Sequence, residues 1–330
     1  MQDGGLDIIG DVHGYVEPLE RLLREMGYAR RGDGAWAHPA RTAVFIGDLI
    51  DRGPHQREVM DLVRRMVDAG TGRAVLGNHE LNALAYATEH AEGGGRFLRP
   101  HVEKNHKQHR AFLAQVGSDS ARPGAWSAAH REALDWFRTL PLWLDLPGLR
   151  VIHACWDADA IARLTPQLGA GGAMTEDLLH AGFTKHTQTY DDLETLLKGL
   201  EAHLPQGFSY KDKEGTARNA IRLRWWKNDG TRNARALAMA PEEALASVPD
   251  VDLDLPRFPA HDHRPCIIGH YWLDGAPRRQ HPMVACVDYS VAAVDSRDAR
   301  KADEARMCAY RWSGEREIVD ANFVHVRARA

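Results

Sequence analysis

The first eighty residues alternate short apolar runs with stretches that place apolar residues at helical spacing. The apolar runs 6–9, 42–46 and 73–76 predict three strands, and the amphipathic stretches 16–26 and 54–69 between them predict two helices. Strands separated by helices of this length pair in parallel through right-handed crossovers. The pattern therefore predicts an α/β fold.

The middle of the chain is more helical, and the last third returns to short strands. Helical periodicity covers 105–116, 127–140 and 176–204. The expected strands are 142–146, 150–153, 220–226, 266–269, 284–288, 307–312 and 317–319. Residues 250–264, rich in aspartate and proline, predict a long exposed loop. Without an internal repeat or a long linker, we expect one domain over 1–330, with insertions at about 81–148 and 155–265.

Charge and composition exclude several classes of protein. The chain has 42 basic and 46 acidic residues, a formal net charge of −4, which argues against a nucleic acid duplex as partner. No apolar run reaches the roughly 18 residues of a membrane span, so no membrane partner is expected. The N-terminus shows no secretory signal pattern. Four cysteines form no CxxC pair and predict buried thiols in a reducing compartment, hence a cytoplasmic protein: Cys155, Cys266, Cys286 and Cys308.

Polar clusters flanked by glycine follow each of the three early strands. They read GDVHG at 10–14, GDLIDRG at 47–53 and GNHE at 77–80. The carboxyl ends of adjacent parallel strands form a crevice where ligands bind. His153 and His270 each end a later predicted strand. We therefore expect these segments, distant in sequence, to meet at one edge of the fold.

The side chains in these clusters suit a metal site. Carboxylate and amide oxygens together with imidazole nitrogens favour Mn²⁺, Fe or Zn²⁺ over Ca²⁺, which prefers oxygen ligands alone. The set offers enough donors for two ions if Asp48 bridges them. The candidate ligands are Asp11, His13, Asp48, Asn78, His153 and His270.

These five blocks, in this order, resemble the calcineurin-like metallophosphoesterases. The GDxxDRG and GNHE forms are more similar to the phosphoprotein-phosphatase branch, and the match covers roughly 6–80, 149–154 and 266–272. The late GHYW motif at 269–272 and the C-terminal strands look more like those of bacterial members of the family, which include symmetrical dinucleoside tetraphosphate hydrolases. The resemblance implies an αββα sandwich, with two mixed sheets flanked by helices and a helical insertion.

The resemblance also implies roles for individual residues at a site with two divalent metal ions, Mn²⁺ in the first place and Fe or Zn as alternatives. Asp11, His13 and Asp48 would hold one ion, with Asp48 bridging to the other. Asn78, His153 and His270 would complete the pair of sites, with His270 beside His13 and His153 beside Asn78.

Catalytic and phosphate-binding roles follow from the same resemblance. His79 and Asp51 look like the acid dyad of the family, and Arg52 like its phosphate clamp. Arg222 and Arg224 are both candidates for a second phosphate-binding arginine, because they point to one face of the predicted strand 220–226.

The implied function is hydrolysis of phosphoric monoesters, as in protein phosphatases, by direct attack of a metal-bridging hydroxide on phosphorus. Symmetrical hydrolysis of a dinucleoside tetraphosphate is the alternative, and a non-catalytic scaffold of the same fold is less favoured. A nuclease is disfavoured by the DRG of 51–53 and by the charge balance. The expected partner is a phosphorylated substrate, either a phosphoprotein or a nucleotide, and the oligomeric state is open.

Other histidines and aromatic residues have simpler interpretations. His101, His106 and His109 lie among charged residues and predict a solvated helical face. Cys155 is expected to be a packed small side chain. Core packing is also expected of five aromatic residues, with stacking on a nucleobase as the alternative: Trp156, Trp225, Trp226, Tyr271 and Trp272.

Overall fold

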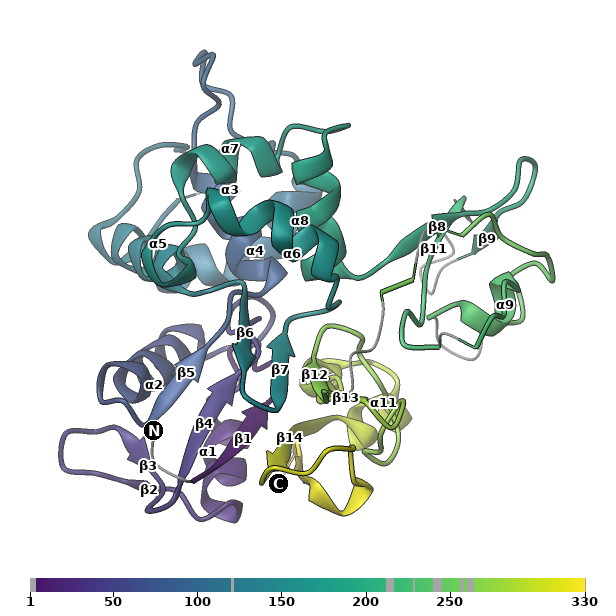
Figure 1. Ribbon diagram of the computed structural model, residues 1–330. Helices are drawn as coiled ribbons and strands as arrows, with labels where there is room; N and C mark the ends of the chain where they lie inside the picture. The colour runs from purple at the N-terminus through teal and green to yellow at the C-terminus, as the bar shows by residue number, and fades with distance from the viewer. Residues whose placement is uncertain are drawn as a thin grey trace.

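Two β-sheets form the centre of the molecule (Figure 1). The computed structural model describes residues 4–119, 122–211, 217–227, 229–239, 245–255, 258–259 and 264–329. The first sheet has the order β15-β14-β1-β4-β5, with β1 Gly5–Ile9, β4 Arg41–Phe45, β5 Gly72–Ala74, β14 Arg306–Trp312 and β15 Phe323–Arg327. The second has the order β13-β12-β7-β6, with β6 Trp143–Leu146, β7 Leu149–Ile152, β12 Cys266–Ile268 and β13 Val284–Cys286.

Both sheets are mixed. Strands β1, β4 and β5 run parallel, whereas β14 and β15 pair antiparallel. In the second sheet β7, β12 and β13 run parallel, and β6 pairs antiparallel with β7. Helices α1 Val16–Glu25 and α2 Gln56–Asp68 form the crossovers between the parallel strands of the first sheet, as predicted.

A compact apolar layer joins the two sheets. Ile8 and Val44 of the first sheet belong to the same buried cluster as Val151 and Ile267 of the second. Their neighbours along each strand belong instead to the larger cluster that contains the helices. This alternation with a period of two residues buries both faces of each sheet. The predicted αββα sandwich of two mixed sheets is therefore confirmed.

Six helices gather beyond one end of the sandwich (Figure 1). Apart from the first turn of α3, they arise from the two segments that were predicted as insertions. The first three are α3 Asn78–Ala87, α4 Glu103–Gln115 and α5 Ala128–Thr139, and the next three are α6 Ala158–Leu164, α7 Glu176–Gly182 and α8 Gln188–Lys198. The division of the chain into one domain with insertions stays a prediction.

The remaining elements are short. An arm carries β8 Glu201–His203 paired with β11 Ala220–Arg222, β9 Tyr210–Lys211 paired with β10 Ala217–Arg218, and helix α9 Ala234–Leu237 (Figure 1). The described residues also form a hairpin of β2 Ala29–Arg30 and β3 Trp36–Ala37, the helix α11 Ala299–Glu304 and four 3₁₀ turns, Thr165–Gln167, Ala170–Gly172, Val291–Asp295 and Asp320–Asn322. No helix among the described residues is both long and apolar enough to cross a membrane.

The predicted helix 176–204 is wrong as a single element. The chain forms α7 and α8 and then enters β8. Between the helices His186 has a left-handed backbone with φ of 64°, and the Thr187 side chain accepts a hydrogen bond from the Tyr190 N–H. This is an N-cap, which starts a new helix. Gly199, with φ of 90°, ends it.

Three other expectations in the last third need correction. The predicted strand 220–226 shortens to β11: the Leu223 N–H still donates to the Leu200 carbonyl in register with β8, but the Arg224 N–H turns away to the Leu237 carbonyl. Segment 317–319 forms no strand and instead buries Ile318 in the layer between the sheets. Strand β15, which was not predicted, pairs with β14 at the sheet edge. The expected loop 250–264 lies partly outside the described residues.

Candidate active site

The predicted ligands meet because each follows a strand end. Three groups follow β1, β4 and β5, which are neighbours in the first sheet, and two histidines follow β7 and β12, which are neighbours in the second. All of these side chains except His270 are buried, and His270 is half-buried. The residues placed in this way are Asp11, His13, Asp48, Asn78, His153 and His270.

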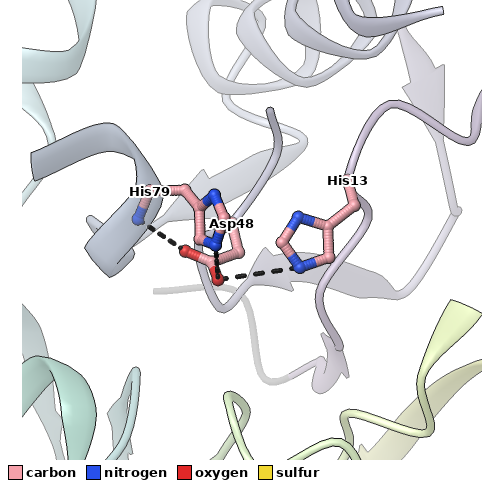
Figure 2. Close-up of side chains that lie close together, drawn as sticks. All are labelled: His13, Asp48 and His79. Atoms are coloured by element: carbon pink, nitrogen blue, oxygen red, sulfur yellow. Dashed lines mark hydrogen bonds and ion pairs between the residues drawn. The ribbon is translucent and has the colours of Figure 1, made fainter. Parts of the chain in front are cut away.

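Asp48 lies at the centre of the cluster. Its Oδ2 is 3.7 Å from His13 Nε2 and 3.8 Å from His79 Nε2 (Figure 2), and its Oδ1 is 3.4 Å from His153 Nε2. Burial alone would raise the pKa of Asp48, but His153 and His79 hold it well below its usual range. The carboxylate is therefore ionised, with imidazoles on both sides.

Two groups of metal-ligating side chains share Asp48. The first comprises His13, Asp48 and His79, the second Asp48, His153 and His270, and one donor atom from each member lies within 4.8 Å of the others. The rings of His153 and His270 are 5.1 Å apart. The structure thus brings His270 together with His153, whereas the resemblance placed it beside His13. Asn78 lies beside His153 as expected, with Oδ1 3.0 Å from Nε2.

Asp11 is a neighbour of this cluster and belongs to neither group of three. Its two carboxylate oxygens accept the backbone N–H of His270, at 3.3 and 3.2 Å. Burial, together with the nearby carboxylate of Asp288, raises the pKa of Asp11 well above its ordinary value. Keeping both of these buried carboxylates ionised costs free energy. A divalent cation bound nearby would offset this cost by supplying positive charge.

The imidazoles are oriented as metal ligands are. His13 Nδ1 donates to the carbonyl of Ile50 and His153 Nδ1 to that of Ile46, each at 2.8 Å, which turns the Nε2 atom of each ring toward the cluster. Burial lowers the pKa of His13 to about 3, so its ring is neutral. Among the described residues, His13 Nε2 and His270 Nδ1 are buried without a hydrogen-bond partner. The lone pair on His13 Nε2, beside the ionised carboxylate of Asp48, fits a divalent metal ion.

His79 and Asp51 form a buried pair next to the ligands. His79 Nδ1 donates to Asp51 Oδ2 at 2.6 Å. Burial alone would lower the pKa of His79, but the carboxylates of Asp48 and Asp51 raise it above its ordinary value. The two carboxylates therefore stabilise the protonated form of the His79 ring.

One of the two candidate arginines reaches the site. Arg222 Nη1 lies 2.9 Å from His270 Nε2, and Nη2 donates to Glu201 Oε1 at 3.2 Å. Arg224 comes after the end of β11, so the two side chains do not share a strand face as the sequence suggested. Of this pair, Arg222 is the one beside a predicted ligand.

Arg52 stacks on Trp272. The guanidinium carbon lies 4.0 Å from the centre of the indole ring, a cation–π contact. Trp272 is 37% exposed, so the expectation that it packs in the core is wrong. The other four aromatic residues expected in the core are buried, as is Cys155, which confirms their expected packing: Trp156, Trp225, Trp226 and Tyr271.

The expected solvated face of three histidines is wrong for His109. That side chain is 1% exposed, and its Nδ1 lies 3.1 Å from Asp51 Oδ2. His109 precedes Phe112 and Leu113 by three and four residues, so all three lie on the buried face of α4. This spacing was the signal in the sequence that could have found it.

Two buried carboxylates have roles that the sequence did not reveal. Glu80 accepts the backbone N–H groups of Asp48 and Leu49, each at 2.8 Å, and so fixes the loop that carries the central carboxylate. Asp288 accepts the N–H of Trp272 at 2.8 Å and that of Ser290 at 2.9 Å. Both act on backbone amides, an interaction that residue spacing alone does not indicate.

The backbone at the site is strained. Six of the eight non-glycine residues with positive φ in the described part of the chain lie here, namely His13, Asp48, Asp51, Arg52, His270 and Trp272. A Cβ at Gly77 would lie 2.3 Å from the backbone nitrogen of Asp48, so the two loops can pass only with glycine there. Positive φ costs free energy at any residue other than glycine, and such residues cluster at functional sites.

The family model for calcineurin-like phosphoesterases matches residues 6–265. Together with the fold and the cluster of metal-ligating side chains, this match shows that the chain belongs to the calcineurin-like phosphoesterase family. The predicted family is confirmed.

Several bacterial proteins and one yeast protein are similar to this chain. The asymmetrical bis(5'-nucleosyl)-tetraphosphatase PrpE of Halalkalibacterium halodurans is 49% identical over 74 residues, which cover 22% of this chain and 30% of that protein. The chain thus matches less than a third of that relative's length. The symmetrical bis(5'-nucleosyl)-tetraphosphatase of Nitrosococcus oceani is 28% identical over 66% of this chain and 75% of that protein. A serine/threonine phosphatase structure from Saccharomyces cerevisiae covers 99% of this chain and 80% of its own, with a TM-score of 0.49 and 13% identity.

Proposed function

We propose that the chain is a metal-dependent hydrolase of phosphoric monoesters. The observation that carries this proposal is the 2.6 Å pair of His79 and Asp51 beside two groups of metal-ligating side chains that share Asp48. An alkoxide leaves phosphorus slowly unless it is protonated, and His79 holds a proton where that oxygen would depart.

Two divalent metal ions, with Mn²⁺ as the first choice, are part of the proposal. Asp11, His13 and Asp48 would hold one, and Asp48 with Asn78, His153 and His270 would hold the other. When bound, such ions supply positive charge to the phosphoryl oxygens and acidify a coordinated water. The buried lone pair of His13 Nε2 and the carboxylates described above are among the donors that this arrangement needs.

The other side chains bind and orient the phosphate. Arg52 beside Trp272 and Arg222 beside His270 offer guanidinium groups, and a planar guanidinium suits two phosphate oxygens at once. Their positive charge offsets the negative charge that spreads over the equatorial oxygens as the bond to phosphorus breaks. Asp51 keeps His79 oriented and protonated through the short hydrogen bond to Nδ1.

Symmetrical hydrolysis of a dinucleoside tetraphosphate is the second candidate. It is supported by the names of the bacterial relatives and by Trp272, whose half-exposed ring lies against the proposed phosphate clamp Arg52. An indole in that place suits a nucleobase, because base stacking on aromatic rings is independent of base identity. The departing group of an anhydride is a nucleotide phosphate, which needs a proton far less than an alkoxide does.

Turnover of two substrates separates the candidates. With Mn²⁺ we expect hydrolysis of p-nitrophenyl phosphate, its loss after EDTA treatment, and its recovery when Mn²⁺ is added back. Diadenosine tetraphosphate is assayed in parallel by chromatography of the nucleotide products. Two molecules of ADP would support the symmetrical reaction, and AMP with ATP the asymmetrical one. Failure to hydrolyse either substrate with Mn²⁺, Fe²⁺ or Zn²⁺ would contradict the proposal and favour a scaffold.

Replacement of Trp272 tests the nucleotide candidate separately. If the indole binds a base, W272A should raise KM for diadenosine tetraphosphate about tenfold, since stacking contributes roughly 1–3 kcal/mol per base. KM for p-nitrophenyl phosphate should change little, and W272F should retain most of the affinity for the dinucleotide. An equal rise for both substrates would instead show that Trp272 acts only through Arg52.

A further inference from the structure

Helix α4 reaches from the helical insertion to the acid pair. The pair itself comes from the loop after β4 and from the start of α3, and α4 lies in a different part of the sequence, 103–115. Three side chains of this helix contact that loop or the helix that follows it. They are Gln108 and His109 at Asp51, and Gln115, whose Oε1 accepts the N–H groups of Gln56 and Arg57 at 2.7 and 3.2 Å.

His109 contacts the carboxylate of Asp51, to which His79 also donates a hydrogen bond. Its Nδ1 lies 3.2 Å from Oδ1 and 3.1 Å from Oδ2 of Asp51. An ionised carboxylate only accepts hydrogen bonds, so Nδ1 of His109 carries the proton and donates it. The Nε2 atom of His109 is buried and has no hydrogen-bond partner among the described residues. A buried imidazole with one nitrogen unsatisfied costs free energy, which makes a purely packing role a poor explanation.

A second donor from α4 supports the same carboxylate. Gln108 Nε2 lies 3.2 Å from His79 Nδ1 and donates to Asp51 Oδ2 at 3.4 Å, and Gln108 Oε1 accepts from Arg99 Nη2 at 2.6 Å. Arg99 in turn donates to Asn82 Oδ1 at 3.0 Å, on the helix that begins with the ligand Asn78. The hydrogen bond from Arg99 to Oε1 therefore fixes the orientation of the Gln108 amide.

The charge of Asp51 depends strongly on this contact. Burial alone would raise the pKa of Asp51, and His109, followed by His79, brings it well below the usual range of a carboxyl group. A carboxylate that accepts from two imidazoles and an amide has a fixed plane. This plane sets the direction in which His79 presents its other nitrogen toward the metal-ligating groups.

We propose that His109 is a positioning residue of the acid pair, which holds the Asp51 carboxylate so that His79 points at the leaving oxygen. This inference rests on the proposed function of His79 as general acid. His109 is buried against Asp51, so its effect on the reaction would pass through that carboxylate. Helix α4 thereby supports a pair whose members come from two other segments, the loop after β4 and the start of α3.

Three variants isolate the hydrogen bond from the packing of the helix. H109L removes the donor at similar volume, whereas H109N keeps an N–H near the place of Nδ1. H106N is the matched control on the same helix, because His106 bonds to the hydroxyl of Tyr86 and not to Asp51. Q108L removes the weaker donor at a half-buried position and serves if H109L fails to fold.

The kinetic test compares leaving groups. For H109L we expect kcat with phenyl phosphate, a poor leaving group, to fall about tenfold, part of the roughly 10²–10⁴-fold that a general acid supplies. The fall with 2,4-dinitrophenyl phosphate should be smaller, KM should stay within twofold, and H109N should recover most of the rate. Equal losses for both substrates, or equal losses in H109L and H109N, would overturn the inference.

A spectroscopic test needs neither metal nor substrate. The proton in the short bond from His79 Nδ1 to Asp51 should give a far-downfield NMR signal in the metal-free protein, absent in H79A. We expect it to persist in H106N and H109N and to shift upfield or broaden in H109L and Q108L. An unchanged signal in both of the latter would contradict a positioning role. If the signal responds but no phosphomonoester is hydrolysed, the proposed function fails while the role of His109 at Asp51 stands.

Discussion

The variant D48N should lose metal binding at both groups of ligands together. Asp48 is the member that the two groups share, so removal of its charge weakens both at once. Loss of outer partners of metal ligands costs about 10–100-fold in affinity, and a shared ligand should exceed about 100-fold. We expect activity to fall in step with metal content, measured by elemental analysis and by titration calorimetry with Mn²⁺.

Asparagine is the right replacement because it leaves the backbone undisturbed. Asp48 has φ of 51°, and asparagine tolerates this left-handed conformation better than other non-glycine residues. The amide oxygen can still accept the N–H of His79, which now donates to Asp48 Oδ1 at 3.0 Å. D145N, at an aspartate paired with Arg264 away from the site, is the control. Full occupancy by two ions in D48N would disprove the shared role.

The variant H79A should separate chemistry from metal binding. His79 is proposed to donate a proton, so its loss should reduce kcat about 10²–10⁴-fold while metal content stays near the wild-type value. The reduction should shrink with 2,4-dinitrophenyl phosphate, which leaves without protonation. H325A, at an exposed position on β15, should behave as wild type.

Because His79 also belongs to one group of metal-ligating side chains, metal content decides between two roles. A variant that loses both metal and activity would make His79 a ligand. A variant with unchanged kcat and full metal would remove His79 from the mechanism. Only retained metal with a large loss that depends on the leaving group agrees with a general acid.

The sequence predicts the site well where chemistry follows a strand directly. Short apolar runs that end in glycine, such as the one before Asp48, encode both the strand and the turn that exposes the ligand. The two-residue alternation of Ile8 and Ile9, one in each apolar cluster, likewise encodes a sheet buried on both faces. Local patterns of this kind need no knowledge of distant contacts.

Predictions from the sequence were wrong where contacts between residues distant in the chain determine burial or strand pairing. His109 lies among charged residues along the chain, and only the docking of α4 against the loop after β4 buries it at Asp51. The break between α7 and α8 depends on the cap at Thr187, which helical periodicity hides. Strand β15 forms because β14 offers an open edge, a fact that local composition does not contain.

The residues with a left-handed backbone conformation at the site imply a conflict between protein stability and activity. Each of them costs roughly 1–3 kcal/mol, so glycine at these positions would relieve strain and would be favoured by any selection for heat resistance alone. Yet every such replacement removes a side chain that the site uses, from His13 to Trp272. An engineered thermostable form of this protein therefore has to gain its stability elsewhere, in the helical insertion or the surface loops.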